Sequence, residues 1–400
     1  MRRIAPAMLV VLAGVSAALH VGKLPTALPV LRAELGVTLV EAGFLLSLVQ
    51  LAGMTLGVAV GLAADGMGLK RTMTAGLAVL AGASLLGGSA QDAGTLMVLR
   101  AVEGLGFLLA SMPAPSLIRK LVEPSRVNVS LGLWGAYMPL GTAVALLGGP
   151  FVMGVLGWQG WWWLLAAVSA LMAVIVWVCL PPDQDAHSSR TSAHADGWSQ
   201  RLRRTLTSRG PWLVALAFAA YSSQWLSLIG FLPSMYAQAG LAAALAGAAT
   251  ALAAAVNMIG NIASGRLLHR GIEPQALLFT GFAAMGLGGV VAFAGPADAV
   301  WLRYGAVLVF SMVGGLIPGT LFSLAVRLAP GESSVSTTVG WTQQWSSIGQ
   351  FFGPPAVAWV VTFTGGWTWS WLVTGSCALA GLVLAAMIGR HVKSCLLPVN

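Results

Sequence analysis

The sequence predicts an all-α membrane protein in which twelve transmembrane helices form two pseudo-symmetric six-helix bundles. Three observations predict this fold: an apolar composition, twelve long apolar runs, and a small-residue pattern that occurs in both halves of the chain. Of the 400 residues, 57% are hydrophobic and 8% are charged. A water-soluble globule of this size carries a much larger charged fraction, so we expect the chain to be surrounded by lipid.

The apolar runs have the length that a bilayer requires. A hydrocarbon core about 30 Å thick needs roughly 20 apolar residues per helix. Segments such as 164–180 are apolar throughout rather than alternating, which excludes a porin-like barrel. The predicted spans are 4–31, 41–64, 72–90, 95–118, 126–155, 158–180, 211–238, 241–264, 274–294, 299–328, 335–362 and 367–390.

A polar segment divides these spans into two groups of six. Residues 181–209 are rich in Ser, His, Asp and Arg and contain few large apolar side chains, as a linker does. We therefore expect an N-terminal bundle at 1–180, a cytoplasmic linker at 181–209 and a C-terminal bundle at 210–400.

The net charge of +9 sets the topology and does not indicate a nucleic-acid partner. With the N-terminus inside, most of the 21 Lys and Arg residues fall on one side of the membrane, as the positive-inside rule requires. We expect a multi-pass monomer in a bacterial-type inner (plasma) membrane, in contact with the bilayer and with both termini in the cytoplasm.

An internal repeat is visible in the fifth and eleventh spans. Gly340, Gly349 and Gly353-Pro354 are spaced like Ala136, Ala145 and Gly149-Pro150. Small residues allow helices to approach closely, and each proline removes one helical hydrogen bond, so we expect packing and hinge sites here. The tryptophan-rich turns 158–163 and 367–371 follow the two segments, and we expect their indoles to anchor the outer membrane interface.

Two motifs carry a resemblance to a known family. Residues 61–71 read G-L-A-A-D-G-M-G-L-K-R, and residues 100–106 read R-A-V-E-G-L-G. With the Gly-Pro segment of the fifth span, these are similar to three signatures of the major facilitator superfamily, although Gly66 and Leu69 replace basic residues of the first. The resemblance implies two bundles that rock about a central site, with a cytoplasmic gating motif of Gly61, Asp65, Gly68, Lys70 and Arg71.

Four ionisable residues lie within predicted spans, where burial of charge is costly and indicates a functional site. His20 and Lys23 share one helix face, as do Arg100 and Glu103, because each pair is three residues apart. Glu103 is our first candidate for a proton-binding group and His20 is the alternative. Arg100 and Glu103 also fit a structural ion pair, and Lys23 fits either an anion site or snorkelling to the headgroups.

Further polar and aromatic side chains within spans could contact a solute without burying a charge. They are Trp134, Tyr137, Tyr221, Gln224, Asn257, Asn261, Trp341, Gln344 and Trp345. The fifteen methionines are scattered and the three cysteines lack ligand spacing, so we expect neither a metal nor a cofactor.

The sequence thus predicts a secondary active, proton-coupled transporter that moves a small solute by alternating access. Basic groups in the first span favour an organic anion or polar metabolite. The alternative is an efflux antiporter for drugs or toxic compounds, which the large aromatic and apolar content favours. The chain carries no Walker loop, nucleophile elbow or zinc spacing, so we do not expect an enzyme.

Overall fold

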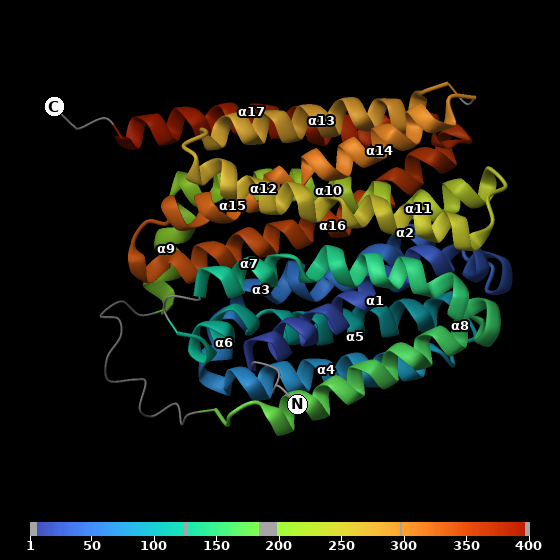
Figure 1. The fold of residues 1–400 in the computed structure, drawn as a ribbon, viewed down its shortest axis with the longest axis horizontal. Coiled ribbons are helices and arrows are strands. Elements are labelled where there is room, and N and C mark those ends of the chain that lie inside the picture. The colour runs from blue at the N-terminus through green and yellow to red at the C-terminus, as the bar shows by residue number, and fades with distance from the viewer. Residues whose placement is uncertain (1–5, 124–126, 184–197, 297, 397–400) are drawn as a thin grey trace. The chain divides into compact units, whose positions relative to one another are not determined.

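The computed structural model describes residues 6–123, 127–183, 198–296 and 298–396 (Figure 1). In the first half, α1 and α2 cover Pro6–Glu34 and Leu39–Ser47, and the 3-10 turn η1 covers Leu48–Gln50. They are followed by α3 to α8 at Leu51–Met67, Leu69–Gly87, Ala93–Ser111, Ala114–Leu121, Val127–Gly135 and Tyr137–Cys179.

The second half begins with α9 at Trp198–Thr207 and α10 at Arg209–Gln238. Helices α11 to α15 follow at Ala243–Ala255, Asn257–His269, Pro274–Ala294, Val300–Gly314 and Leu316–Arg327. The 3-10 turns η3 and η4 cover Glu332–Ser334 and Trp367–Ser370, and α16 and α17 cover Val335–Thr364 and Trp371–Leu396.

The predicted all-α fold class is confirmed, although many spans are built from shorter pieces. Three consecutive elements, α2, η1 and α3, form the second predicted span. Conversely, α8 contains two spans, separated at Gly157, whose φ of 68° interrupts the helix. Such a positive φ is open to glycine and strained for other residues.

Nine helical segments of the described chain are long and apolar enough to cross a membrane. The predicted spans 72–90 and 335–362 are not among them, although α4 and α16 form there as long helices. Both helices carry more polar residues than their neighbours, including Lys70 and Arg71 in α4 and Gln343 and Gln344 in α16.

The helix starts are fixed locally. Thr38 and Glu41 form a reciprocal capping box at α2, in which each side chain satisfies a free backbone N–H group. Asp92 caps α5 and accepts hydrogen bonds from the Thr95 backbone and hydroxyl at 2.8 and 2.7 Å. The hydrogen bond from the Thr95 side chain lowers the pKa of the Asp92 carboxyl below its ordinary value.

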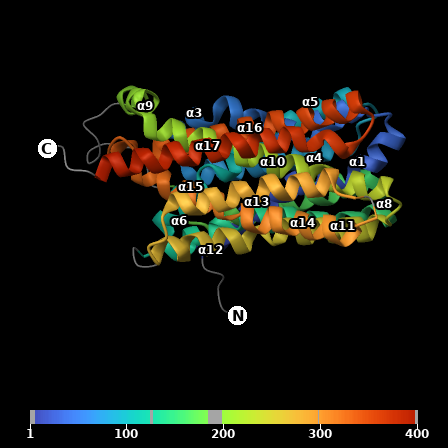
Figure 2. The same cartoon turned by 90° about the horizontal axis from the view of Figure 1, so that it is seen from above.

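The chain divides into two compact units, one of residues 1–193 and 229–255, the other of residues 194–228 and 256–400. Within the first unit, α1 packs along α8 and α4 packs against α5. Within the second unit, α13 packs against α14 and α17 (Figure 2). The division into bundles at 1–180 and 210–400 stays a prediction.

The small-residue repeat marks two equivalent helix contacts, one in each unit. A Cβ atom at Gly149 would lie 2.8 Å from the Thr26 hydroxyl of α1, and one at Gly353 would lie 2.6 Å from the Ser223 carbonyl of α10. One turn earlier, Ala145 lies against Gly22 of α1 and Gly349 lies against the Ala219 carbonyl of α10. The repeat therefore sets how closely α8 and α16 approach their partners.

Gly340 differs from the other glycines of the repeat. A Cβ atom at Gly340 would meet no atom within 4 Å, so packing does not require glycine there. Pro150 and Pro354 lie inside α8 and α16, and their role as hinges stays a prediction.

The expectation that the first tryptophan-rich turn anchors the membrane interface is wrong for three of its residues. Trp158, Trp161 and Trp162 are buried inside the protein, where their indoles cannot reach headgroups. The Trp158 indole instead donates a hydrogen bond to Glu34 at 2.8 Å. Trp163 is 46% exposed, as is appropriate for an anchor.

Candidate functional site

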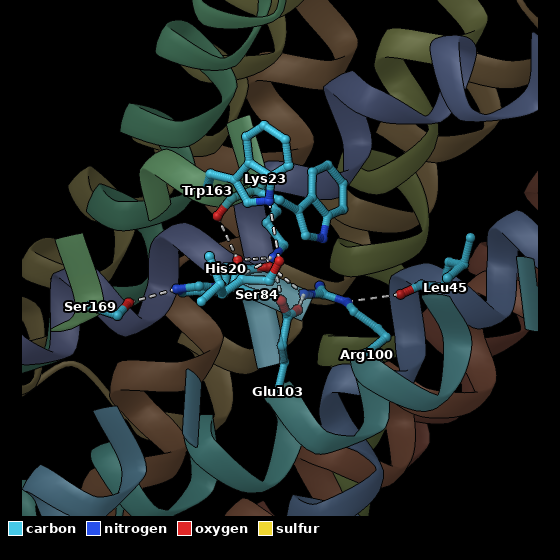
Figure 3. A network of polar contacts seen from close by, with 10 residues as sticks. His20, Lys23, Leu45, Ser84, Arg100, Glu103, Trp163 and Ser169 are labelled. Atoms are coloured by element: carbon cyan, nitrogen blue, oxygen red, sulfur yellow. Dashed lines mark hydrogen bonds and ion pairs between the residues drawn. The ribbon is translucent and has the colours of Figure 1, made fainter. Parts of the chain in front are cut away.

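The four ionisable residues predicted inside spans converge in one polar cluster (Figure 3). Helix α1 supplies His20 and Lys23, and α5 supplies Arg100 and Glu103. All four side chains are at most 2% exposed. Because Lys23 is fully buried, snorkelling to the headgroups is excluded.

The ammonium group of Lys23 lies at the centre of this cluster. Its Nζ atom donates to Glu103 Oε1, to Ser84 Oγ at 3.0 Å and to His20 Nδ1 at 3.3 Å. The face of the Trp162 ring lies 4.5 Å away, at the distance of a cation–π interaction. All three N–H donors of the lysine therefore have an acceptor.

Glu103 lies between two cations. Its Oε1 atom accepts from Lys23, and its Oε2 atom accepts from Arg100 Nη1 at 2.7 Å. Arg100 also binds backbone carbonyls, with Nε 3.1 Å from Leu45 O and Nη1 2.6 Å from His20 O. The guanidinium thus ties α5 to α1 and α2, while its buried Nη2 atom has no hydrogen-bond acceptor among the described residues.

The contacts of His20 assign its tautomer. A charged lysine only donates, so Nδ1 must accept the hydrogen bond from Lys23, and the ring proton then sits on Nε2. Nε2 lies 2.8 Å from the Ser169 hydroxyl of α8. Lys23, His20 and Ser169 therefore form a continuous hydrogen-bonded chain from α1 to α8 (Figure 3).

Glycines bring the supporting helices within reach. A Cβ atom at Gly104 would lie 2.6 Å from the Val49 carbonyl, and one at Gly106 would lie 2.7 Å from the Leu80 backbone nitrogen. These contacts allow α5 to approach η1 and α4 closely. As a result, Ser84 of α4 reaches Lys23 and donates its own proton to the Trp162 carbonyl at 2.9 Å.

Three members of the cluster were missed from the sequence: Ser84, Trp162 and Ser169. Serines are common in membrane helices, and nothing in the spacing of Ser84 and Ser169 marks them. Trp162 belongs to the tryptophan-rich turn, which we assigned to the membrane interface.

The other predicted contact residues of the first unit form a separate aromatic pair. The rings of Trp134 and Tyr137 stack with centroids 4.0 Å apart. The Trp134 ring fills the space beside Gly14 of α1, where a Cβ atom would collide with it. This pair packs α7 and α8 against α1.

In the second unit, the predicted amides join a hydrogen-bonded network. Asn257 donates to the Tyr221 hydroxyl at 3.1 Å and to the Ser311 carbonyl at 2.8 Å, and Asn261 donates to Asn257 Oδ1 at 2.9 Å. Trp225 donates to the Ser311 hydroxyl at 3.1 Å. The network links α10, α12 and α14, so these groups are largely committed to the protein.

Three tryptophans of α10 and α16 form an aromatic cluster near the start of both helices. The Trp212 ring packs edge-on against Trp341 and Trp345, with centroids 4.9 and 5.4 Å apart. The buried indole N–H groups of Trp341 and Trp345 have no hydrogen-bond acceptor among the described residues. The buried Oε1 atom of Gln224 likewise has no hydrogen-bond donor among them. Gln344 lies on the same helix, one residue before Trp345.

The predicted gating motif is described only in part. The side chains of residues 61–67, which include Gly61 and Asp65, lie outside the described residues. Lys70 and Arg71 begin α4, and both of their backbone N–H groups donate to the Asp183 carboxylate at 3.0 Å. A Cβ atom at Gly68 would lie 2.5 Å from that carboxylate, and the Lys70 ammonium donates to the Leu180 carbonyl at 2.6 Å.

No group of three or more His, Cys, Asp or Glu side chains in the described part of the chain is placed to hold a metal ion. The buried cluster offers a hydrogen bond from Lys23 to His20 along which a proton can move, together with an excess of positive charge.

Comparisons with known proteins agree with this picture. The Major Facilitator Superfamily profile matches residues 8–354. The chain is 35% identical over 160 residues to a puromycin resistance protein of Streptomyces alboniger, covering 40% of this chain and 31% of that protein. It is 28% identical over 313 residues to human monocarboxylate transporter 11, covering 73% of this chain and 62% of that protein. The chain thus spans less than two thirds of the length of these curated relatives.

A solved structure has the same fold over nearly the whole chain. It is a bacterial homolog of the human lysosomal transporter Spinster, in an inward-facing and occupied conformation. The two structures superpose with a TM-score of 0.78 at 15% identity, covering 96% of each chain. This similarity shows the fold, and the profile match over residues 8–354 shows that the chain belongs to the Major Facilitator Superfamily.

Proposed function

We propose that this transporter couples the movement of a small organic anion to protons, and that the buried polar cluster of His20, Lys23, Arg100 and Glu103 is the coupling site. The observation that carries the proposal is the charge of the cluster. Two cations, Lys23 and Arg100, share one carboxylate at no more than 2% exposure. With a neutral His20, one positive charge has no counter-charge.

An uncompensated charge in a dry interior is costly, so the cluster favours any event that balances it. Loss of the Lys23 proton leaves a neutral cluster. Protonation of Glu103 would instead leave two cations without a carboxylate. The geometry therefore supports Lys23 as the proton carrier and Glu103 as its fixed counter-charge, a different division of roles from our first expectation.

His20 is placed to receive the proton that Lys23 releases. Its Nδ1 atom accepts from Lys23, and its Nε2 atom contacts Ser169 on α8. Transfer from Lys23 to Nδ1 produces an imidazolium whose two N–H groups already have partners. The imidazole can thus accept a proton from the lysine on its way toward α8.

The same charge argument supports an anionic solute. An anion that approaches the cluster stabilises the protonated lysine, so anion and proton bind together and are transported in the same direction. Similarity to human monocarboxylate transporter 11 over 73% of the chain agrees with this substrate class. We further propose that the protein is a monomer in a bacterial plasma membrane with cytoplasmic termini.

The second candidate function is efflux of drugs or toxic compounds. It is favoured by the 35% identity to the puromycin resistance protein and by the cluster of Trp212, Trp341 and Trp345. Large aromatic surfaces bind planar apolar solutes with little need for charge.

Uptake into proteoliposomes distinguishes the two. We would compare radiolabelled pyruvate, puromycin and tetraphenylphosphonium in wild type, Lys23→Met and Glu103→Gln, with and without an imposed pH gradient. The matched controls are Lys393→Met and Glu273→Gln, because this pair is also a Lys–Glu ion pair but is 66% and 63% exposed.

The proposal predicts that an inwardly directed proton gradient drives pyruvate accumulation in wild type and both controls, and that Lys23→Met abolishes it. Accumulation of puromycin or tetraphenylphosphonium without pyruvate would replace the anion proposal by efflux. Wild-type pyruvate accumulation by Lys23→Met would show that the buried cluster is structural.

A further inference from the structure

A second group of buried polar side chains lies in the second unit, where α9 packs against η3 and the start of α16. It shares no residue with the buried cluster of Lys23 and Glu103. Its hydroxyl groups belong to Ser334, Thr337, Thr338 and Thr205, all of which are at most 3% exposed. None of the four hydroxyls has a hydrogen-bond partner within the described residues.

Other buried threonines of the second unit do have partners. The buried hydroxyls of Thr320 and Thr342 donate to the carbonyl four residues earlier, at 2.7 and 2.9 Å, which is the ordinary way to satisfy a threonine in a helix. Thr337 and Thr338 lie in the first turn of α16, and their hydroxyls do not make this hydrogen bond. Their buried hydroxyls are thus left without a partner among the described residues.

On each of the two elements, helix periodicity places the unpartnered groups on one side. Ser334 precedes α16, and Thr337 and Thr338 follow it at three and four residues, which places all three on one side of the first turn. On α9, Arg201 and Thr205 are four residues apart. Thr205 is fully buried whereas Arg203 and Leu206 are exposed, so the Arg201 and Thr205 side is the one that packs on η3 and α16.

Arg201 adds positive charge to this junction. Its Nε atom is buried and has no acceptor among the described residues. The start of α16, a 30-residue helix, carries the positive end of its dipole, while the N–H group of its first residue, Val335, donates to the Glu332 carbonyl of η3. Glu332, the carboxylate of η3, is exposed, where solvent screens it.

A guanidinium group and backbone N–H groups only donate, so the ligand must be rich in acceptors. Several donors that converge on a helix N-terminus beside an arginine suit a tetrahedral oxyanion. We propose that the junction of α9, η3 and α16 binds a phosphate group, held by Arg201, Thr205, Ser334, Thr337 and Thr338. The phosphate is either the free ion or the headgroup of an anionic phospholipid.

The test compares the two phosphate sources on the whole purified protein. The first arm measures the melting temperature in detergent as inorganic phosphate is added at constant ionic strength. The second arm measures it in nanodiscs of phosphatidylcholine with and without phosphatidylglycerol. Arg201→Gln and Thr338→Val remove proposed contacts, and Arg203→Gln and Thr342→Val are the matched controls from the same two helices.

We expect one source to raise the melting temperature of wild type and of both controls. Arg201→Gln and Thr338→Val should weaken the apparent affinity about tenfold or more, because each removes a hydrogen bond to a charged ligand. Thr338→Val should fold at least as well as wild type without phosphate, since it removes a buried unpaired hydroxyl.

The pattern of results assigns the source. Stabilisation by inorganic phosphate identifies a soluble ligand, and stabilisation by phosphatidylglycerol alone identifies a lipid headgroup. If neither source stabilises the protein, or if the control variants lose the effect equally, the site does not exist. Because no residue of the coupling cluster is changed, failure here leaves the transport proposal untouched.

Discussion

At the scale of single residues, Lys23 and Arg100 both pair with Glu103 but differ in their other contacts. Glu103 accepts from both Lys23 and Arg100, and Arg100 is additionally held by the carbonyls of His20 and Leu45. Arg100 is therefore held by backbone contacts on neighbouring helices, whereas the Lys23 ammonium donates to the side chains of His20, Ser84 and Glu103. On this ground we propose that the arginine organises the cluster and that the lysine changes its charge.

This asymmetry predicts a difference in stability between two variants. Glu103→Gln leaves two buried cations without a carboxylate, and breaking a buried pair in this way costs about 3–5 kcal/mol. Lys23→Met leaves Arg100 and Glu103 as a neutral pair and fills the space with an apolar chain, so it should cost much less. Thermal unfolding in detergent should show a larger drop in melting temperature for Glu103→Gln.

The exposed Glu273→Gln variant is the control for this comparison, because surface ion pairs contribute roughly 0–1 kcal/mol. Equal destabilisation by Lys23→Met and Glu103→Gln would contradict the charge assignment. That result would mean that the two groups form an isolated pair and that Arg100 does not share the carboxylate.

At this scale the sequence predicted the residues whose burial in a membrane is costly and did not predict the uncharged ones. Charges in apolar spans are rare, so His20, Lys23, Arg100 and Glu103 could be predicted as a cluster from their positions. Ser84, Ser169 and Trp162 could not, because uncharged residues in membrane helices carry no such penalty. Only the packing of α4 and α8 against α1 brings them to Lys23.

At the scale of helices, the same close contact is made in each unit. Gly22 and Thr26 of α1 meet Ala145 and Gly149 of α8, while Ala219 and Ser223 of α10 meet Gly349 and Gly353 of α16. The partner residues are four apart in both cases, as on one helix face. The spacing read from the sequence thus corresponds to a repeated backbone approach, which the repeat alone could not locate.

Two substitutions in α16 test the importance of this contact. Gly349→Ala places a Cβ atom against the Ala219 carbonyl and should destabilise the protein by about 1–3 kcal/mol, as overpacking does. Gly340→Ala meets no atom within 4 Å and should leave stability unchanged or raise it slightly, because alanine favours helix more than glycine.

The measurement is the melting temperature of both variants, with Gly340→Ala serving as the control for helix propensity. Equal melting temperatures would mean that α10 and α16 can move apart to accept the added methyl group without loss of stability. The repeat would then record common ancestry of the two halves rather than a present packing requirement.

Broken helices and buried tryptophans mark the limits of prediction at this scale. The second predicted span is continuous in hydropathy but is built from α2, η1 and α3. The turn at Gly157 orients the following helix so that Trp158 and Trp162 point inward. Both features depend on tertiary contacts, which a hydropathy window does not contain.

At the scale of the whole molecule, formal charge and neutral polar groups are distributed unequally. The first unit contains the charged cluster with its excess positive charge. In the second unit, the predicted contact residues are amides, indoles and a phenol, such as Asn257, Trp345 and Tyr221. This distribution supports the proposal that ion coupling belongs to the first unit.

Lys23, on the proposal above, couples transport to protons by losing and regaining its charge. The variant Lys23→Arg separates charge from proton release, because arginine keeps the positive charge but does not release its proton. We would measure two quantities in proteoliposomes with radiolabelled pyruvate: exchange against internal pyruvate without a pH gradient, and accumulation driven by a pH gradient. Lys393→Arg is the exposed control.

We expect Lys23→Arg to keep exchange, which would show that the protein is folded and binds the anion, but to lose accumulation by about tenfold or more, as loss of a proton-coupling step should. Lys393→Arg should behave as wild type in both assays. Accumulation by Lys23→Arg at the wild-type level, or the absence of pyruvate accumulation in wild type, would show that Lys23 does not couple transport to protons.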